Sequence, residues 1–353
     1  MTTVSISSGL SCPTPITMVD RIQLGHGSGG KMSAALLRDH FLPLLDNDIL
    51  RQLGDAAVVS AHGGEIAIST DTFVVSPLEF PGGNIGSLAV HGTLNDLAMM
   101  GARPRFLTAG FVLEEGLSLE ILKRVVTAMA QAARENDVLL VTGDTKVVER
   151  GKADGMYVNT TGVGLVEPAF RPRPDSARPG DVVIVSGPIA RHGMAIMAAR
   201  EGLDFEAQIE SDSASLVPLV EELRTRVGDA VHVLRDPTRG GLASALNEIA
   251  AASRVGVTIQ EAALEIPEAV AGSCEMLGLD PLYVANEGLL VAFVAPDRAA
   301  DAIEALRSHE IGSHAAVVGS VGSVNAGLVV LQTRMGSKRV VDMLPGEQLP
   351  RIC

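Results

Sequence analysis

Tryptophan is absent from this sequence of 353 residues, and aromatic residues make up only 3% of it. Proteins that hold single-stranded nucleic acid stack its bases on aromatic side chains, so this composition argues against that class. Basic residues are also scarce, with 28 Lys and Arg against 42 Asp and Glu and a formal net charge of -14. This balance argues against any nucleic-acid partner, but it permits a nucleotide whose phosphates are bridged to carboxylates by Mg²⁺.

The chain has three cysteines, Cys12, Cys274 and Cys353, which are too few and too scattered for a disulfide framework. None belongs to a Cys-x-x-Cys pair, which argues against a structural zinc site. The first 19 residues carry no positive charge, and no apolar run approaches the ~20 residues needed to cross a bilayer. We therefore expect a globular protein of the cytoplasm, with 46% apolar residues to build its cores.

The domain organisation is expected to have four parts. Three prolines in the ten residues 171–180 predict a linker between two domains. The four parts are a loose arm at 1–24, an N-terminal domain at 25–170, a C-terminal domain at 171–342, and a mobile tail at 343–353 that carries Cys353.

Strands and helices mix without strict alternation, which predicts α+β domains whose sheets are covered on one face. The apolar period over Leu119–Glu135, with Ser118 as N-cap, predicts an amphipathic helix. Further helices are expected at 193–200 and 241–252. Runs of β-branched residues predict strands at 65–70, 106–113, 138–142, 156–163, 181–186, 289–294, 315–322 and 328–331.

A local pattern recurs in which an apolar run, usually strand-like, ends in an aspartate among small or polar neighbours. Any one such aspartate is more often an ordinary turn or N-cap residue than a ligand. Five aspartates that converged would repel one another, so divalent cations are their natural counter-ions and a nucleotide triphosphate the natural companion. The five are Asp55, Asp71, Asp96, Asp144 and Asp236.

The glycine-rich segment 25–31 fits the first seven positions of a P-loop, Gly-x-x-x-x-Gly-Lys. The next residue is Met32, where a P-loop needs a hydroxyl for Mg²⁺, so the P-loop interpretation is rejected. A flexible flap over phosphates remains the better prediction, because unhindered backbone N–H groups can cradle anions.

Read together, the motifs resemble a known ATP-binding superfamily. It includes aminoimidazole ribonucleotide synthetase, selenophosphate synthetase and thiamine-monophosphate kinase. The ending Pro350-Arg351-Ile352-Cys353 is similar to that of the HypE family of hydrogenase maturation factors within it, and the resemblance spans about residues 25–353. The motifs that carry it are Gly54-Asp55-Ala56-Ala57, Asn95-Asp96, Gly143-Asp144-Thr145-Lys146 and Arg235-Asp-Pro-Thr-Arg-Gly-Gly241.

The resemblance implies a two-domain aminoimidazole ribonucleotide synthetase-like fold, whose N-terminal sheet pairs with its copy in a homodimer. It implies that Asp55, Asp71, Asp96, Asp144 and Asp236 hold Mg²⁺ and phosphate. The implied ATP contacts are Gly27, Ser28, Gly29, Gly30, Lys31, Asn95, Asp144 and Lys146. The implied partners are the carbamoyltransferase HypF, which loads a carbamoyl group onto Cys353, and the HypC–HypD iron scaffold complex, which receives cyanide.

The chemistry expected of such a family is ATP-dependent dehydration of S-carbamoyl-Cys353 to a thiocyanate. The carbamoyl oxygen attacks the γ-phosphate of ATP, and the phosphorylated imidate then loses a proton and phosphate. Lys146 and Glu287 are the two candidates for the group that takes the proton, and a salt bridge at a strand end is the alternative for both. A tail is a suitable carrier because it keeps the cargo at high local concentration and can still swing outward.

Two other functions stay open at this point. One is a related synthetase or kinase acting on a free small molecule, which would not need Cys353. A selenophosphate synthetase is a weaker form of it, because Cys12 lies 13 positions before Gly25. The other is a docking protein that uses its tail to bind partners and has a dead nucleotide site.

Overall fold

The computed structural model describes residues 22–353, apart from 46, 62, 203–207, 345, 347, 348 and 350. In this part of the chain, residues 57–166 build a five-stranded sheet in the order β1-β2-β7-β5-β6. Neighbouring strands in it are antiparallel, except that β5 and β6 run parallel. Strand β6 stands last in the order and is therefore an edge of the sheet. The strands are β1 (Ala57–Ala61), β2 (Gly64–Phe73), β5 (Ala102–Glu114), β6 (Leu139–Val148) and β7 (Met156–Val166).

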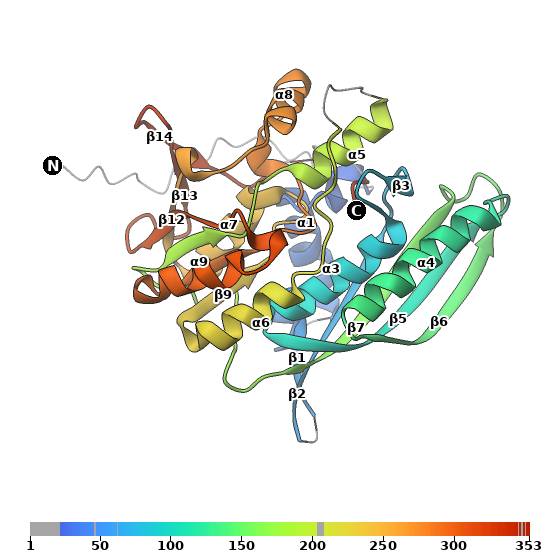
Figure 1. The fold of residues 1–353 in the computed structure, drawn as a ribbon, viewed down its shortest axis with the longest axis horizontal. Coiled ribbons are helices and arrows are strands. Elements are labelled where there is room, and N and C mark those ends of the chain that lie inside the picture. The colour runs from blue at the N-terminus through green and yellow to red at the C-terminus, as the bar shows by residue number, and fades with distance from the viewer. Residues whose placement is uncertain are drawn as a thin grey trace.

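Two helices, α3 (Ile85–Met99) and α4 (Leu119–Glu135), lie over one face of this sheet (Figure 1). The prediction for α4 is confirmed at both ends, and the side chain of Ser118 accepts the N–H of Glu120 as its N-cap. Helix α3 is buried on nearly all sides, because it lies between the first sheet and the second domain and contacts α4, α6 and β9. A short hairpin, β3 (Glu79–Phe80) and β4 (Gly83–Asn84), precedes it.

The described residues 182–341 form a seven-stranded sheet in the order β14-β13-β10-β12-β8-β11-β9. Its strands are β8 (Val182–Val185), β9 (Val231–Arg235), β10 (Gly256–Gln260), β11 (Val291–Val294), β12 (Ala316–Gly322), β13 (Val329–Gln332) and β14 (Lys338–Val341). Its helices are α5 (Arg191–Glu201), α6 (Val217–Arg226), α7 (Gly241–Ser253), α8 (Glu268–Leu277) and α9 (Ala299–Arg307).

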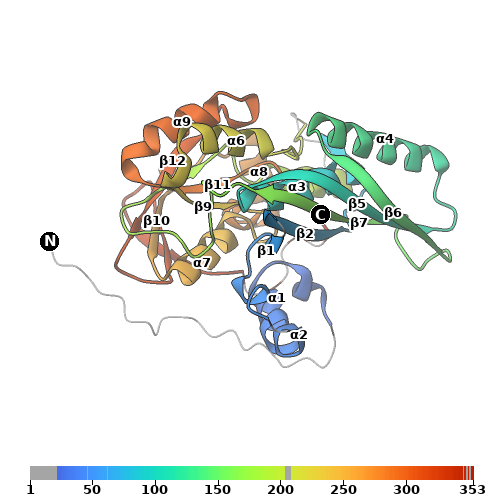
Figure 2. The same ribbon diagram turned by 90° about the horizontal axis from the view of Figure 1, so that it is seen from below.

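Helices cover both faces of this second sheet, with α6 and α9 on one side and α7 on the other (Figure 2). Along β8, Val183 and Val185 pack into one core and Ile184 into the opposite one. The expectation of sheets covered on one face is therefore wrong for the C-terminal domain. It holds for the first sheet, whose other face leaves Phe106 and Leu165 exposed.

Short elements make up the rest of the described chain. Helices α1 (Lys31–Leu36) and α2 (Leu42–Leu45), joined by the π-helix η2 (Leu37–Phe41), lie beside β1 (Figure 2). None of the described helices combines the length and apolar character of a membrane span. The 3-10 helices are η1 (Leu24–Gly27), η3 (Leu50–Gln52), η4 (Gly228–Ala230), η5 (Glu261–Ala263), η6 (Pro281–Tyr283), η7 (Pro296–Arg298) and η8 (Glu310–Gly312).

Candidate active site

An acidic pocket of about 260 Å³ lies where the first sheet, α3, the end of β9 and the last residue of the chain meet. Its charged side chains come from segments that are far apart in the sequence and belong to both domains. The residues that line it are Gly54, Asp55, Ser69, Thr70, Asp71, Gly92, Asp96, Arg235, Asp236, Thr238, Arg239, Glu287 and Cys353.

Three aspartates in this pocket are close enough to share one cation. Asp55, Asp96 and Asp236 each offer a carboxylate oxygen within 4.8 Å of the others. Burial raises the pKa of Asp55 to about 8, and the charges of Asp236 and Glu248 add to it. Burial likewise raises the pKa of Asp236 to about 6 and that of Asp96 well above its ordinary value. Such a set of oxygen donors, costly to ionise on its own, suits a hard divalent cation such as Mg²⁺.

Arg235, the last residue of β9, neutralises part of this charge. Its guanidinium lies 2.5 Å from a carboxylate oxygen of Asp55 and 2.6 Å from one of Glu248. It therefore connects the acidic pocket to a second, larger cavity.

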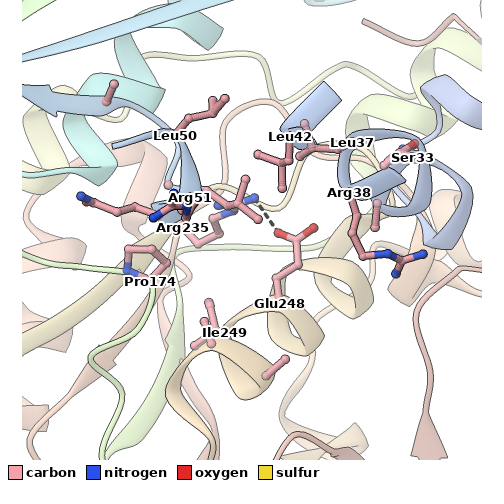
Figure 3. Close-up of a pocket in the computed structure, with 18 of the residues that line it drawn as sticks. Ser33, Leu37, Arg38, Leu42, Leu50, Arg51, Pro174, Arg235, Glu248 and Ile249 are labelled. Atoms are coloured by element: carbon pink, nitrogen blue, oxygen red, sulfur yellow. Dashed lines mark hydrogen bonds and ion pairs between the residues drawn. The ribbon is translucent and has the colours of Figure 1, made fainter. Parts of the chain in front are cut away.

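The larger cavity has a volume of about 740 Å³ and is mostly apolar (Figure 3). It shares Gly54 and Arg235 with the acidic pocket, and Figure 3 shows Glu248 reaching Arg235 across its middle. Helix α7 supplies Glu248 and Ile249, and the N-terminal helices supply apolar walls such as Leu37 and Leu42. Gly29 and Gly30 of the glycine-rich segment line it too.

Cys353 is buried in the acidic pocket, although the tail was expected to be mobile. The amide N–H of Val74 donates to the main-chain oxygen of Cys353 at 3.0 Å, and the N–H of Ser76 donates to the carbonyl of Arg351 at 3.2 Å. The described end of the tail is thus docked beside the end of β2.

The thiol of Cys353 lies among charged groups. Burial raises the pKa of this thiol to about 12, with Arg239 opposing the shift and Glu287 adding to it. Burial also raises the pKa of Glu287 well above its ordinary value, helped by Asp236 and Asp71. Arg239 lies 3.9 Å from Asp71 and interacts with Cys353 as well. A glutamate with raised basicity therefore lies in the same pocket as a cysteine and a guanidinium.

The comparisons with known proteins agree with this geometry. Models of the AIR synthase related protein match this chain, the N-terminal domain over residues 53–166 and the C-terminal domain over 178–331. The carbamoyl dehydratase HypE of Rhizobium leguminosarum bv. viciae is 51% identical over 333 residues, which cover 94% of this chain and 95% of that protein. The chain belongs to the HypE family of carbamoyl dehydratases.

Solved HypE structures resemble the chain over its whole fold. A crystal structure of HypE in complex with ATP has a TM-score of 0.80 and 51% sequence identity, and the match covers 94% of this chain and 100% of that one. HypE in the HypE–HypF complex has a TM-score of 0.84 and 47% identity, covering 88% of this chain and 100% of that one. The two-domain aminoimidazole ribonucleotide synthetase-like fold and the HypE resemblance are therefore confirmed.

Of the five aspartates, the structure brings Asp55, Asp71, Asp96 and Asp236 together in one pocket, and Asp144 of the same chain does not line it. Asp144 and Lys146 lie on the edge strand β6, both exposed, with Lys146 Nζ 2.5 Å from a carboxylate oxygen of Asp144. The lysine lowers the pKa of Asp144 through this hydrogen bond. The sequence pattern predicts an aspartate at the end of a strand, but Asp71 lies inside β2 and Asp144 lies inside β6.

The side chain of Asn95 is bonded to the second domain. Its side-chain oxygen accepts the N–H of Leu216 at 2.7 Å, and its NH₂ group donates to the carbonyl of Ala214 at 3.0 Å. It is buried, it joins α3 to the second domain, and it lines neither the acidic pocket nor the larger cavity, so the expected nucleotide contact stays a prediction.

In the glycine-rich segment, Gly29 and Gly30 line the cavity, whereas Gly27, Ser28 and Lys31 do not. Ser28 Oγ lies 3.2 Å from the carbonyl oxygen of Gly346, and Lys31 pairs with Asp342. The segment therefore binds the tail as well as bordering the cavity.

Sequence reasoning missed Arg239 and the arginine bridge through Arg235. Both arginines lie inside the Arg235–Gly241 motif, and two cations on either side of Asp236 were a usable signal. Glu248 had none, because it lies in the middle of α7 without an unusual neighbour.

Proposed function

We propose that this chain uses ATP to convert S-carbamoyl-Cys353 into S-cyano-Cys353, which supplies the cyanide ligand for the iron centre of NiFe hydrogenase. The observation that carries the proposal is the burial of Cys353 in the aspartate-lined pocket. A carbamoyl group on that sulfur would meet the carboxylates, Glu287 and Arg239. An enzyme for a free small molecule would have no need to fill its own site with its last residue.

We propose that the triphosphate of ATP occupies the acidic pocket and that its nucleoside occupies the adjoining cavity beside Gly29 and Gly30. Asp55, Asp96 and Asp236 would hold Mg²⁺, with Asp71 beside them. When bound there, Mg²⁺ supplies positive charge that offsets the phosphate oxygens.

The reaction then needs few protein groups. The carbamoyl oxygen forms a bond to the γ-phosphorus, and ADP leaves with the electron pair of the broken P–O bond. The carbamoyl nitrogen gives up one of its two hydrogens as a proton to solvent while the C=N bond of the imidate forms. Arg239 stabilises the negative charge on the phosphorylated imidate. A base takes the remaining N–H proton, the C–O bond breaks, phosphate leaves, and the nitrogen lone pair completes S–C≡N. Glu287 is the proposed base, because burial makes its carboxylate more basic.

Asp144 and Lys146 line neither cavity of their own chain, so they would reach such a site from a second copy. Strand β6 is an edge strand with Leu139, Val141 and Val147 exposed, and an apolar sheet edge of this kind favours pairing with another chain. We propose a homodimer in which the first sheet pairs with its copy and β6 of one protomer carries Asp144 and Lys146 to the other's pocket. Lys146 would there orient the carbamoyl nitrogen.

The proposed partners follow from the cargo. HypE is known in complex with HypF, so we propose that HypF loads the carbamoyl group onto Cys353. The HypC–HypD complex is the proposed acceptor of cyanide. A free thiol at Cys353 requires a reducing compartment, which favours the cytoplasm.

We propose that the two domains are divided at residues 171–180, a segment that overlaps the interval between the two matched domains.

Intact-mass spectrometry tests the function directly. After incubation with HypF, carbamoyl phosphate and ATP, we expect a carbamoyl adduct on Cys353 that loses one water only when the ATP is hydrolysable. Cys353→Ala should carry no adduct, and Asp96→Asn should stop at the carbamoyl stage. A dehydrated adduct formed without ATP would refute the proposal, as would unchanged ATP turnover by Cys353→Ala with a free substrate.

A further inference from the structure

The backbone of the docked tail is held by a buried histidine. His192 Nε2 lies 2.6 Å from the carbonyl oxygen of Ile352, the residue directly before Cys353. His192 is completely buried, and it stands 160 positions away from Ile352 in the sequence. The Phe80 ring and its imidazole pack in a T-shaped pair, with the ring centroids 5.6 Å apart and the planes at 88°. The imidazole therefore has a fixed place and one hydrogen bond into the tail.

The hydrogen bonds of His192 define its protonation. A carbonyl oxygen only accepts, so Nε2 must carry the hydrogen. On the other side of the ring, Nδ1 lies 2.7 Å from Ser211 Oγ. That hydroxyl already accepts the N–H of Ser213 at 3.0 Å, which leaves its own hydrogen free to donate to Nδ1. Burial lowers the pKa of His192, against an opposing effect of Asp212. The network thus fits a neutral imidazole with the hydrogen on Nε2.

The same part of α5 is fixed to the loop that carries Glu287. The N–H of Ala190, at the start of this helix, donates to the side-chain oxygen of Asn286 at 2.7 Å. Asn286 directly precedes Glu287. The start of α5 is therefore bonded both to the residue before Glu287 and to the residue before Cys353.

We propose that His192 is a positioning residue for the dehydration reaction, holding the carbonyl of Ile352 so that the group on Cys353 meets Glu287. The role rests on the proposed function of Cys353 as cargo carrier. It acts through the tail, since the imidazole contacts backbone and not the reacting atoms.

His192→Ala and His192→Gln test this role, because the glutamine amide keeps a donor near the position of Nε2. Loss of one buried, orienting hydrogen bond should slow single-turnover dehydration by about tenfold in His192→Ala, with the KM for ATP unchanged. His192→Gln should recover most of the rate. Alkylation of Cys353 by iodoacetamide should become faster in His192→Ala, because the thiol leaves its buried position more often, and carbamoyl loading by HypF should not slow.

His314→Ala is the matched control, because His314 pairs with Glu265 at the surface and should behave as wild type in each assay. If His192→Ala lowers the melting temperature too far, Ser211→Ala keeps the proposal testable. It leaves His192 in place but removes the hydroxyl that selects its tautomer, and it should shift both rates in the same direction by less.

Wild-type alkylation and dehydration rates in His192→Ala would overturn the inference, as would a glutamine variant no better than alanine. The two proposals fail separately. If wild type forms no dehydrated adduct, the proposed function fails, while the alkylation rates still report whether His192 holds the tail. If dehydration occurs but alkylation is the same in all variants, the positioning role fails alone.

Discussion

The amide N–H of Val74 donates a 3.0 Å hydrogen bond to the main-chain oxygen of Cys353, which joins the last residue of the chain to the first residue after β2. Asp71 lies three positions earlier on that strand and lines the same pocket. Docking of the tail and placement of the Asp71 carboxylate therefore depend on the same strand.

Gly30→Ala should loosen the tail. A Cβ at Gly30 would lie 2.3 Å from the carbonyl oxygen of Leu344, so the backbone there must move and the 2.8 Å bond from Lys31 N–H to that oxygen must weaken. We expect Cys353 to be alkylated several-fold faster, because the docked tail loses the free energy of about one hydrogen bond. Gly27→Ala is the control, because no described atom lies within 4 Å of its added Cβ. Equal alkylation rates in the two variants would contradict the contact.

Glu287→Gln should lower dehydration by about 10² to 10⁴-fold, the usual contribution of a general base. Because the base must be ionised and its pKa is raised, the wild-type rate should increase with pH through a value well above the ordinary 4.5. The glutamine variant should lose this dependence. Single-turnover mass spectrometry across the pH range measures both, with exposed Glu265→Gln as control. An unchanged pH profile in Glu287→Gln would assign the base elsewhere.

Mixing two inactive variants tests the shared site. Asp96→Asn inactivates the pocket of its own chain, whereas Lys146→Ala removes the amine that its chain contributes to the pocket of the partner chain. Random mixing makes half of the dimers heterodimers, each with one intact site, so about a quarter of wild-type activity should return. The measurement is dehydration after co-refolding or subunit exchange, with each variant alone as the control. No recovery in verified heterodimers would mean that Lys146 does not act across the interface.

Without Mg²⁺, stability should fall as pH rises. The folded-state pKa of Asp55, about 8, and that of Asp236, about 6, exceed their ordinary 3.8. The folded protein therefore holds more protons than the unfolded chain between these values, and ionisation on raising the pH favours unfolding. We expect the Tm to drop by at least about 3 °C across this window. Mg²⁺ should restore it more at the upper end than at the lower, because protons compete for the same oxygens.

Asp96→Asn sharpens that test. Removing a buried carboxylate charge should raise the Tm of the metal-free protein at the upper end of the window and reduce its response to Mg²⁺. Exposed Asp175→Asn, whose carboxylate pairs with Arg173, should do neither. A Tm independent of pH and of Mg²⁺ would argue against a cation site.

The parts predictable from sequence were those with a local cause. Helix α4 has its apolar stripe and Ser118 cap within its own residues, and the aspartate motifs are recognisable one by one. Asn95 and Asp96 show where this ends. Neighbours on a helix point about 100° apart, so one faces the second domain and the other faces the pocket. No local pattern indicates which is which.

Contacts between distant segments were out of reach for the same reason. The bond from His192 to Ile352 has no signal in either neighbourhood. The motif around Asp144 is recognisable, but its position relative to a pocket is not. That position depends on which chain pairs with the edge strand β6.

The glycine-rich segment is tied to the tail at Leu344 and Gly346, as well as bordering the larger cavity. A tail that leaves the pocket to collect its next carbamoyl group would break these hydrogen bonds and release the part of the cavity lining around Gly30. Departure of the carrier arm and exchange of spent nucleotide would then fall in the same half of the cycle. While the tail is away from the site, the larger cavity would be less enclosed beside Gly30, and ATP would be held there more weakly.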